Sequence, residues 1–255
     1  MTLILGFYSS TPQSGKSTTS NVLKAHFTTT VVKISGAMKD MNVAILNQTE
    51  VFQSTINTQD IWAWVDGKDK DSVVPNLTPD TACTTHTVNA FLDSVSTFMG
   101  ADASILDETG QPLTQERLMV DMNTIWKPVL QDLFAQQGGL TCRDIQKTIG
   151  LEWFRKTYGF NIWISMVEQI IQNATTDIVV VDDVRFEADA DLVVRNGGLL
   201  VYISRPQDNV SGTHASEGLL ENNPFDVRLV NNSTLDDFET QINTKLIPLV
   251  TKNMK

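Results

Sequence analysis

A short run of small residues around one lysine, close to the N-terminus, could bind a phosphate group. Ser14, Gly15, Lys16 and Ser17 directly follow one another. Backbone N–H groups of such a loop can cradle an anion, and the lysine ammonium can reach a terminal phosphate. The hydroxyl of Ser17 can bind Mg²⁺, and Gly15 lets the backbone approach the phosphate without a Cβ in the way. This order of residue types predicts a phosphate-binding loop.

The start of this loop departs from the full phosphate-loop pattern. Ser10 stands where the pattern has its first glycine, and Pro12 removes one N–H donor from the cradle. These departures leave an ordinary turn between a strand and a helix, with an exposed lysine, as the alternative interpretation.

A second group of charged residues follows an apolar run at 178–181. Its four β-branched residues predict a buried parallel strand, with Asp182 and Asp183 at the carboxyl end. An acidic residue there can bind Mg²⁺ or its waters, and either aspartate could serve. The alternative for Asp182 is that it caps the turn at Asp183. Arg185, two residues further on, is a candidate for neutralising phosphate charge.

Four cations lie within fourteen residues of one another in the middle of the chain: Arg143, Lys147, Arg155 and Lys156. The first two are four residues apart, so they share one face of a predicted helix. Glu152 lies among the four and would orient or partly neutralise them. Phosphoryl transfer needs such cations, whereas the alternative interpretation is a solvated helix face.

Lys39 lies in a predicted turn at 35–39, just past the end of a predicted strand at 30–34. This is the edge at which open α/β sheets bind ligands. Taken alone, Lys39 is better interpreted as a solvated lysine.

Trp62 and Trp64 form an aromatic cluster further on, which could clamp a base but is more typical of core packing.

The pattern of elements predicts the fold class. Apolar strand patterns occur at 2–8, 30–34, 178–181, 199–203 and 225–230. Helical patterns occur at 18–27, 114–136 with a kink or break before Pro128, 141–149, 162–171, 188–195 and 234–250. Alternating strands and helices with buried strands predict an α/β fold, a parallel sheet flanked by helices.

Residues 48–115 are less regular, although 88–99 has helical spacing. We therefore expect a core made of residues 1–47 and 116–255. Residues 48–115 would form an inserted or peripheral, mostly helical lobe that binds the substrate or closes over it.

The composition narrows the class of protein. The 255 residues carry a formal net charge of −11, which argues against binding to long nucleic acid. Two cysteines, Cys83 and Cys142, make no disulfide framework and indicate a reducing compartment. No stretch approaches the ~18 apolar residues of a membrane span, and no basic segment typical of a signal peptide precedes the first strand. We expect a cytoplasmic protein without a membrane partner.

The ordered set of motifs resembles the deoxynucleoside monophosphate kinases of tailed bacteriophages, a branch of the P-loop kinases. The resemblance covers the first 45 residues and about 141–247, and not 48–115. The matching stretches are Ser14–Ser17, Ile34–Asp40, Arg143–Arg155 with Asn161–Trp163, Val180–Phe186 with Asp189, Ile203–Pro206 with His214–Glu217, and Leu229–Asn232.

The resemblance implies a P-loop kinase-like sheet and transfer of the γ-phosphoryl group of ATP, with Mg²⁺, to deoxynucleoside 5′-monophosphates. The products would be the diphosphates used for DNA precursors. It also implies a homodimer, working in the host cytoplasm if the chain is encoded by a phage. Ala37 replaces a common Pro of the family. Lys147 and Leu151 depart from the family's usual Gln and Thr, which leaves the base preference open but not the reaction class.

Site residues carried over from the resemblance join those expected from the residues themselves. Residues expected to bind ATP are Ser14, Gly15, Lys16, Ser17, Thr18 and Arg205. Residues expected to act in catalysis are Lys16, Arg143, Lys147, Arg155, Asp183 and Arg185. Residues expected to bind the acceptor are Lys39, Arg143, Lys147, Gly150, Glu152, Trp163 and Asp183. Metal ligands are Ser17 and Asp183. Trp163 either stacks on the acceptor base or packs in the core.

Two other functions are open from the sequence. One is a P-loop kinase for a different small acceptor, such as a coenzyme precursor. The other is a nucleotide-binding regulatory protein without catalysis, which Ser10 and Pro12 would suit.

Overall fold

The computed structural model describes residues 2–9, 13–48, 61–67, 69–100, 104–206, 220 and 223–254. Ser10, Pro12, His214 and Glu217 of the sequence motifs lie outside these described residues. The chain divides into two compact units. Unit 1 consists of Met1–Ile34 and Ile171–Lys255, and unit 2 of Ser35–Ile170. The expected division placed residues 35–47 and 116–170 with the core, but these segments belong to unit 2.

Unit 1 is built on a five-stranded parallel sheet with strand order β2-β3-β1-β4-β5. The strands are β1 (Leu3–Tyr8), β2 (Thr29–Val32), β3 (Ile178–Val184), β4 (Leu199–Ser204) and β5 (Val227–Val230). The sheet confirms the expected α/β class with a P-loop kinase-like parallel sheet. Because β1 connects to one side of the sheet and β3 to the other, the chain reverses its direction of winding between them, which is where such sheets bind ligands.

The pairing of β1 with β3 changes register next to this position. Gly6 pairs with Val181, whereas Tyr8 pairs with Val184. Two residues of β3, Asp182 and Asp183, therefore stand opposite one residue of β1. An extra residue of this kind bends the strand and re-aims its side chains. The shift places both aspartates at the carboxyl edge of the sheet.

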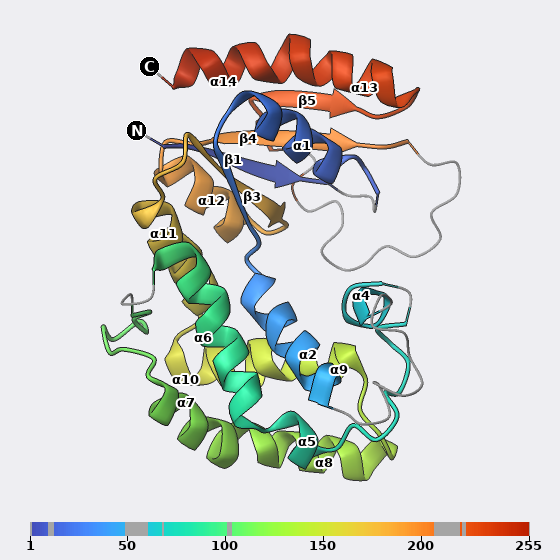
Figure 1. Ribbon diagram of the computed structural model, residues 1–255, viewed down its shortest axis with the longest axis vertical. Coiled ribbons are helices and arrows are strands. Elements are labelled where there is room, and N and C mark those ends of the chain that lie inside the picture. Colours follow the sequence, from blue (N-terminus) through green and yellow to red (C-terminus); the bar gives the residue numbers. More distant parts are fainter. Residues whose placement is uncertain are drawn as a thin grey trace. The chain divides into compact units, whose positions relative to one another are not determined.

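Helices cover both faces of the sheet, as buried parallel strands require. The helices of unit 1 are α1 (Lys16–His26), α12 (Glu187–Arg195), α13 (Leu235–Gln241) and α14 (Ile247–Asn253). Leu3, Leu5 and Phe7 of β1 share one core cluster with Leu23 of α1 and Phe238 of α13. The helix α12 lies on the face opposite α14 (Figure 1).

Gly6 allows α12 to approach the sheet closely. A Cβ at this position would lie 2.7 Å from a methyl group of Val193 on α12, closer than side-chain atoms pack. Neighbouring strand residues alternate between the two faces of a sheet, so Gly6 lies on the face opposite the side chains of Leu5 and Phe7. The glycine therefore sets the distance between β1 and α12.

Unit 2 is helical among its described residues. Its helices are α2 (Gly36–Gln48), α4 (Ile61–Val65), α5 (Pro79–Ala82), α6 (Thr85–Met99), α7 (Gln115–Asp121), α8 (Lys127–Gln137), α9 (Cys142–Lys147), α10 (Lys156–Tyr158) and α11 (Ile162–Asn173), whose last residues reach unit 1. The helices α2 and α6 pack against each other (Figure 1).

Two predicted helices of unit 2 contain π-helical segments, and the one predicted at 141–149 continues to Tyr158. Between α7 and α8 the chain passes through a π-helical segment, Met122–Trp126, just before Pro128. A second π-helical segment, Thr148–Arg155, joins α9 to α10. Such wider turns admit an extra residue without ending the helix. Where a kink or break was expected before Pro128, the structure therefore has a local change of helical pitch.

Stacked aromatic rings fill the centre of unit 2. Trp126 stacks on Trp153, with ring centroids 5.2 Å apart, and Phe154 packs against Trp153 at 4.8 Å. Phe91 of α6 joins them, 4.9 Å from Phe154. Burial of each ring contributes about 1.5–3 kcal/mol of stability, so this cluster is a large part of the core of the unit.

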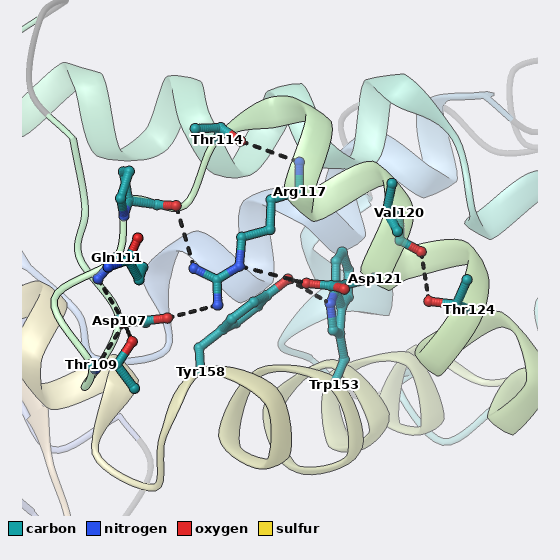
Figure 2. A network of polar contacts seen from close by, with 11 residues as sticks. Asp107, Thr109, Gln111, Thr114, Arg117, Val120, Asp121, Thr124, Trp153 and Tyr158 are labelled. Carbon is teal, nitrogen blue, oxygen red and sulfur yellow. Dashed lines mark hydrogen bonds and ion pairs between the residues drawn. The ribbon is translucent and has the colours of Figure 1, made fainter.

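A polar network fastens the segment before α7 to the end of the α9–α10 helix (Figure 2). Arg117 donates to Asp107 Oδ2 at 2.7 Å, and its guanidinium lies over the ring of Tyr158, 5.1 Å from the centroid. Tyr158 donates in turn to Asp121 at 3.0 Å and accepts from Trp153 Nε1 at 3.1 Å.

The carboxylate of Asp107 is the buried anion of this network. Burial raises its pKa, but hydrogen bonds from the Thr109 hydroxyl, the Gln111 N–H and Arg117 outweigh that effect and hold the pKa well below its ordinary value. Arg117 is fixed by the same contacts, so the charge pair lies inside a satisfied set of hydrogen bonds.

No helix among the described residues is both long enough and apolar enough to cross a membrane.

Asp107→Asn is expected to lower the free energy of unfolding at pH 7 by about 1–3 kcal/mol, because it removes a buried hydrogen-bonded charge. A carboxylate whose pKa is lowered in the folded state stabilises above its unfolded pKa of about 3.9, and this contribution disappears as the pH falls further. Urea unfolding measures the free energy of unfolding of the parent protein and of the variant. The difference between the two should therefore be constant from pH 7 to 5 and smaller at pH 3.

Asp93→Asn is the matched control, because Asp93 is an exposed aspartate of α6. It should change stability by less than about 0.5 kcal/mol. A gap for Asp107→Asn that widens towards pH 3 would contradict the assigned direction of the pKa shift.

Candidate functional site

The loop before α1 is held by residues from the other end of the chain. Gly15 has φ +114°, and a Cβ there would lie 2.6 Å from the ring of Phe238 on α13. Asn231 Nδ2 donates to the carbonyl oxygen of Ser14 at 3.1 Å. The hydroxyl of Thr19 donates to the carbonyl oxygen of Gly15 at 3.0 Å. The ring of Phe238 thus packs against the loop, and hydrogen bonds to the carbonyl oxygens of Ser14 and Gly15 fix its backbone.

This arrangement has the properties of an anion cradle. The Ser14 side chain is buried, and its Oγ has no hydrogen-bond partner among the residues that the structure describes. Gln13, with φ +55°, begins the tight turn, and its carbonyl oxygen accepts from Arg205 at 3.4 Å. Ser17 is exposed and Thr18 is half-buried in the first turn of α1. N–H groups at such a helix start favour a bound anion.

Lys16 lies among four charged side chains at the carboxyl edge of the sheet. Burial lowers its pKa, and the carboxylate of Asp182, the largest effect after burial, acts in the opposite direction. Arg185 and Lys33 add to the lowering, while Asp183 counteracts it. The structure therefore brings together the sequence-predicted residues Lys16, Asp183 and Arg185.

The two aspartates have different partners. Asp182 is buried, and its Oδ2 lies 3.8 Å from Lys33 Nζ, just past β2. Asp183 Oδ1 accepts from the backbone N–H of Ile34 at 2.6 Å. Both aspartates lie within β3, which continues to Val184, so the turn expected at Asp183 is strand in the structure. Asp189 Oδ2 fixes the following turn by accepting from the N–H groups of Arg185 and Phe186.

A group of cations lies in unit 2, on helices that touch each other. Lys39 is in the first turns of α2, and Arg143 and Lys147 are on α9. The two helices are tied where Asn42 Nδ2 donates to the carbonyl oxygen of Cys142 at 3.1 Å. Arg143 and Lys147 both lower the pKa of Asp71, so both lie near this carboxylate. The helix face predicted from their spacing is present.

Lys39 is not a solvated lysine, so that preferred interpretation is wrong. Its side chain is 8% exposed, and its Nζ lies 2.8 Å from Asp66 Oδ2. The cause is local structure: the expected turn at 35–39 is helical from Gly36 onward, which turns Lys39 inward. Trp62 corrects a second expectation, because it is 51% exposed rather than packed in the core.

The remaining cations of the middle segment make other contacts. The guanidinium of Arg155 lies over the exposed ring of Phe160, 5.0 Å from its centroid. Lys156 pairs with Glu152, four residues earlier on the same helix. Glu152 therefore partly neutralises this segment, through Lys156.

Trp163 and Gly150 are joined in the core of unit 2. Trp163 Nε1 donates to the carbonyl oxygen of Gly150 at 3.3 Å, and its ring stacks on Phe154 with centroids 4.6 Å apart. Only 5% of Trp163 is exposed. Met38 packs against Gly150, where a Cβ would lie 3.2 Å from its sulfur. This placement favours the core-packing alternative for Trp163 over stacking on a base.

Several residues at these positions were not found from the sequence. The predicted second strand includes Lys33, whereas β2 ends at Val32. Asn231 and Phe238, which support the loop, carry no local signal of that role. Asp66 and Asp71 lie in the less regular stretch at 48–115, whose pattern does not indicate a charged partner for either. Lys33 alone had a usable signal, because parallel strands end at one edge of a sheet.

Comparison with known proteins shows the family of the chain. The profile of the deoxynucleotide monophosphate kinase family matches residues 5–242. A protein of Acanthamoeba polyphaga mimivirus, provisionally named a deoxynucleotide monophosphate kinase, is 36% identical over 87 residues. That match covers 34% of this chain and 44% of the viral protein, less than half its length. The family profile spans most of the chain, both units included, and the chain belongs to the deoxynucleotide monophosphate kinase family.

Proposed function

We propose that this protein transfers the γ-phosphoryl group of ATP to deoxynucleoside 5′-monophosphates and releases the diphosphates used for DNA precursors. The observation that carries the proposal is the loop at 14–17 beside the carboxylates of Asp182 and Asp183. A kinase needs a phosphate cradle and an acidic residue for its metal at one place. Membership of the family supports the choice of acceptor.

Unit 1 supplies the donor site in this proposal. The loop N–H groups and Lys16 hold the β- and γ-phosphates, and the loop keeps its shape because Phe238 and Asn231 support it. Arg185 neutralises charge that develops on the transferred group. The proposed ATP-binding residues are Ser14, Gly15, Lys16, Ser17, Thr18 and Arg205.

The Mg²⁺ ion that such kinases use fits the residues present. Ser17 would bind it, together with Asp183 directly or through water, and Asp182 is the alternative ligand. Among the described residues, no three His, Cys, Asp or Glu side chains gather into a metal site of their own. Mg²⁺ in kinases needs no such cage, because phosphates and water complete its coordination. When bound, it would neutralise the charge of the phosphates.

Unit 2 supplies the acceptor site. Lys39, Arg143 and Lys147 bind the phosphate of the deoxynucleotide, and Arg155 adds positive charge for the transfer. Gly150, Glu152 and Trp163 complete the proposed set, Trp163 from the core through its hydrogen bond to Gly150. There is little covalent chemistry for these residues to do, so their work is alignment and charge neutralisation.

We place the reaction in the cytoplasm. Burial raises the pKa of the Cys83 and Cys142 thiols to about 12, so both stay protonated at neutral pH. Free thiols fit a reducing compartment.

A homodimer, implied by the resemblance to the phage kinases, is tested by light scattering of the purified protein.

ADP production from ATP, measured with each common deoxynucleoside monophosphate in turn, tests the function itself. We expect release that depends on at least one of these acceptors and on Mg²⁺. ATP binding without release for any acceptor would favour the silent regulatory alternative. Release only with a coenzyme precursor would favour the other kinase alternative.

Lys16→Met is expected to lower kcat at least about 100-fold, because one preorganised charge on the transferred phosphate is lost. The fold should persist, since the methionine keeps the buried stem, and circular dichroism checks this. Lys24→Met is the matched control, an exposed lysine on the same helix. Near-normal turnover in Lys16→Met would remove Lys16 from the site.

Asp183→Asn separates the charge of this residue from its structural hydrogen bond. The amide oxygen still accepts from the N–H of Ile34, so β2 and β3 should keep their arrangement. We expect the Mg²⁺ concentration for half-maximal activity to rise, or kcat to fall strongly, in a magnesium titration. Asp191→Asn, an exposed aspartate on α12, is the control. An unchanged titration for Asp183→Asn would leave Asp182 as the metal residue.

A further inference from the structure

The loop that follows α4 places a carboxylate on each of two proposed acceptor cations. Asp66 Oδ2 lies 2.8 Å from Lys39 Nζ. Asp71 binds the Arg143 guanidinium through both carboxylate oxygens, with Nη2 donating to Oδ2 at 3.0 Å and Nε donating to Oδ1. Each anion thus occupies donors that a phosphate would use.

The backbone of this loop is seated on the neighbouring helices. The N–H of Arg143 donates to the carbonyl oxygen of Lys70 at 3.0 Å. The N–H of Asp69 donates to the carbonyl oxygen of Ala63, also at 3.0 Å. Gln146 of α9 donates to the carbonyl oxygen of Val65 at the end of α4. The two ion pairs are therefore built into the way the loop packs, and are not chance contacts of long side chains.

The burial of the four charged groups is unequal. The side chain of Lys39 is 8% exposed and that of Arg143 28%, whereas Asp66 is 44% exposed and Asp71 59%. A buried ammonium without a nearby anion is unfavourable, so Lys39 needs a counter-ion at all times. The exposed carboxylates hold their partners weakly, because water screens such pairs.

A phosphate monoester is the stronger ligand for these cations. It carries about −1.5 to −2 charge at pH 7, and its oxygens match the two parallel N–H donors of an arginine. A carboxylate carries a single charge. Replacement of the carboxylates by the phosphate is therefore favourable for a charged acceptor, and it is not available to an acceptor without a phosphate group.

We propose that Asp66 and Asp71 are the resting counter-ions of the acceptor-phosphate site, and that the phosphate of the deoxynucleotide displaces them. This inference rests on the proposed function. The two carboxylates set the affinity for the acceptor and select against nucleosides, because an uncharged ligand cannot replace them. They are specificity-determining residues that act through Lys39 and Arg143.

Asp66→Asn and Asp71→Asn test this directly, with Asp69→Asn as the matched control. Asp69 lies in the same loop, so its variant removes the same charge without touching either ion pair. Calorimetry with a deoxynucleoside monophosphate should show Kd falling about 2- to 5-fold in each of the first two variants. In steady-state kinetics, the two substitutions should change KM more than kcat. Asp69→Asn should change Kd less than 2-fold, and binding of the deoxynucleoside should stay weak throughout.

Arg143→Gln combined with Asp71→Asn shows whether Asp71 acts through Arg143. In the Arg143→Gln background, Asp71→Asn should no longer tighten binding of the monophosphate. Thermal unfolding of each variant confirms that the fold persists. A full effect of Asp71→Asn in that background would overturn the inference for Asp71.

The direction of the change decides the inference. Weaker binding in Asp66→Asn and Asp71→Asn would mean that the carboxylates position the cations, and would overturn the proposal, as would unchanged Kd values. Calorimetry with inorganic phosphate repeats the comparison without turnover. Failure of the wild-type protein to release ADP with any deoxynucleotide would reject the proposed function, whereas a phosphate Kd that does not fall in the two variants rejects the counter-ion role alone.

Discussion

Positive charge held near carboxylates is the interaction on which the proposed chemistry depends. The chain carries a formal net charge of −11, so its cations must be kept together by specific structure. In unit 1, burial disfavours the ammonium of Lys16, and Asp182 and Asp183 act against this effect. The same aspartates are the candidates for the metal. The register shift of β3, the turn at Gly15 and the support from Asn231 all serve to hold these groups at one sheet edge.

In unit 2, by contrast, the carboxylates that pair with the cations are exposed, and in our proposal the phosphate of the acceptor displaces them. Lys39 and Arg143 each have an aspartate partner from one loop, and the partner is the more exposed member of each pair. A stacked aromatic core and the partly buried network around Arg117 hold this unit together. Helices that carry cations, together with weakly held anions, suit a site whose ligand must bind and leave in each cycle.

Much of the fold followed from local pattern. Strands such as β1 and β3 and helices such as α6 and α13 are signalled by neighbouring residues, so their existence was predicted well. Boundaries were less certain: β2 ends at Val32, which frees Lys33 for Asp182, and α2 begins at Gly36, which buries Lys39. Trp62 was assigned to the core because of its residue type, yet exposure depends on which helices pack against α4. The spacing of apolar residues along one helix does not show which other helices will pack against it.

By itself, the sequence determined the loop at 14–17, the acidic strand end and the grouping of Arg143 with Lys147, because each depends on residues close together in the chain. Tertiary structure alone decided the partners. Asp66 meets Lys39 across 27 residues, Asp71 meets Arg143 across 72, and Asn231 meets Ser14 across 217. Strand order and helix packing bring such residues together, and both are set by burial of apolar surface over the whole unit, not by any short stretch.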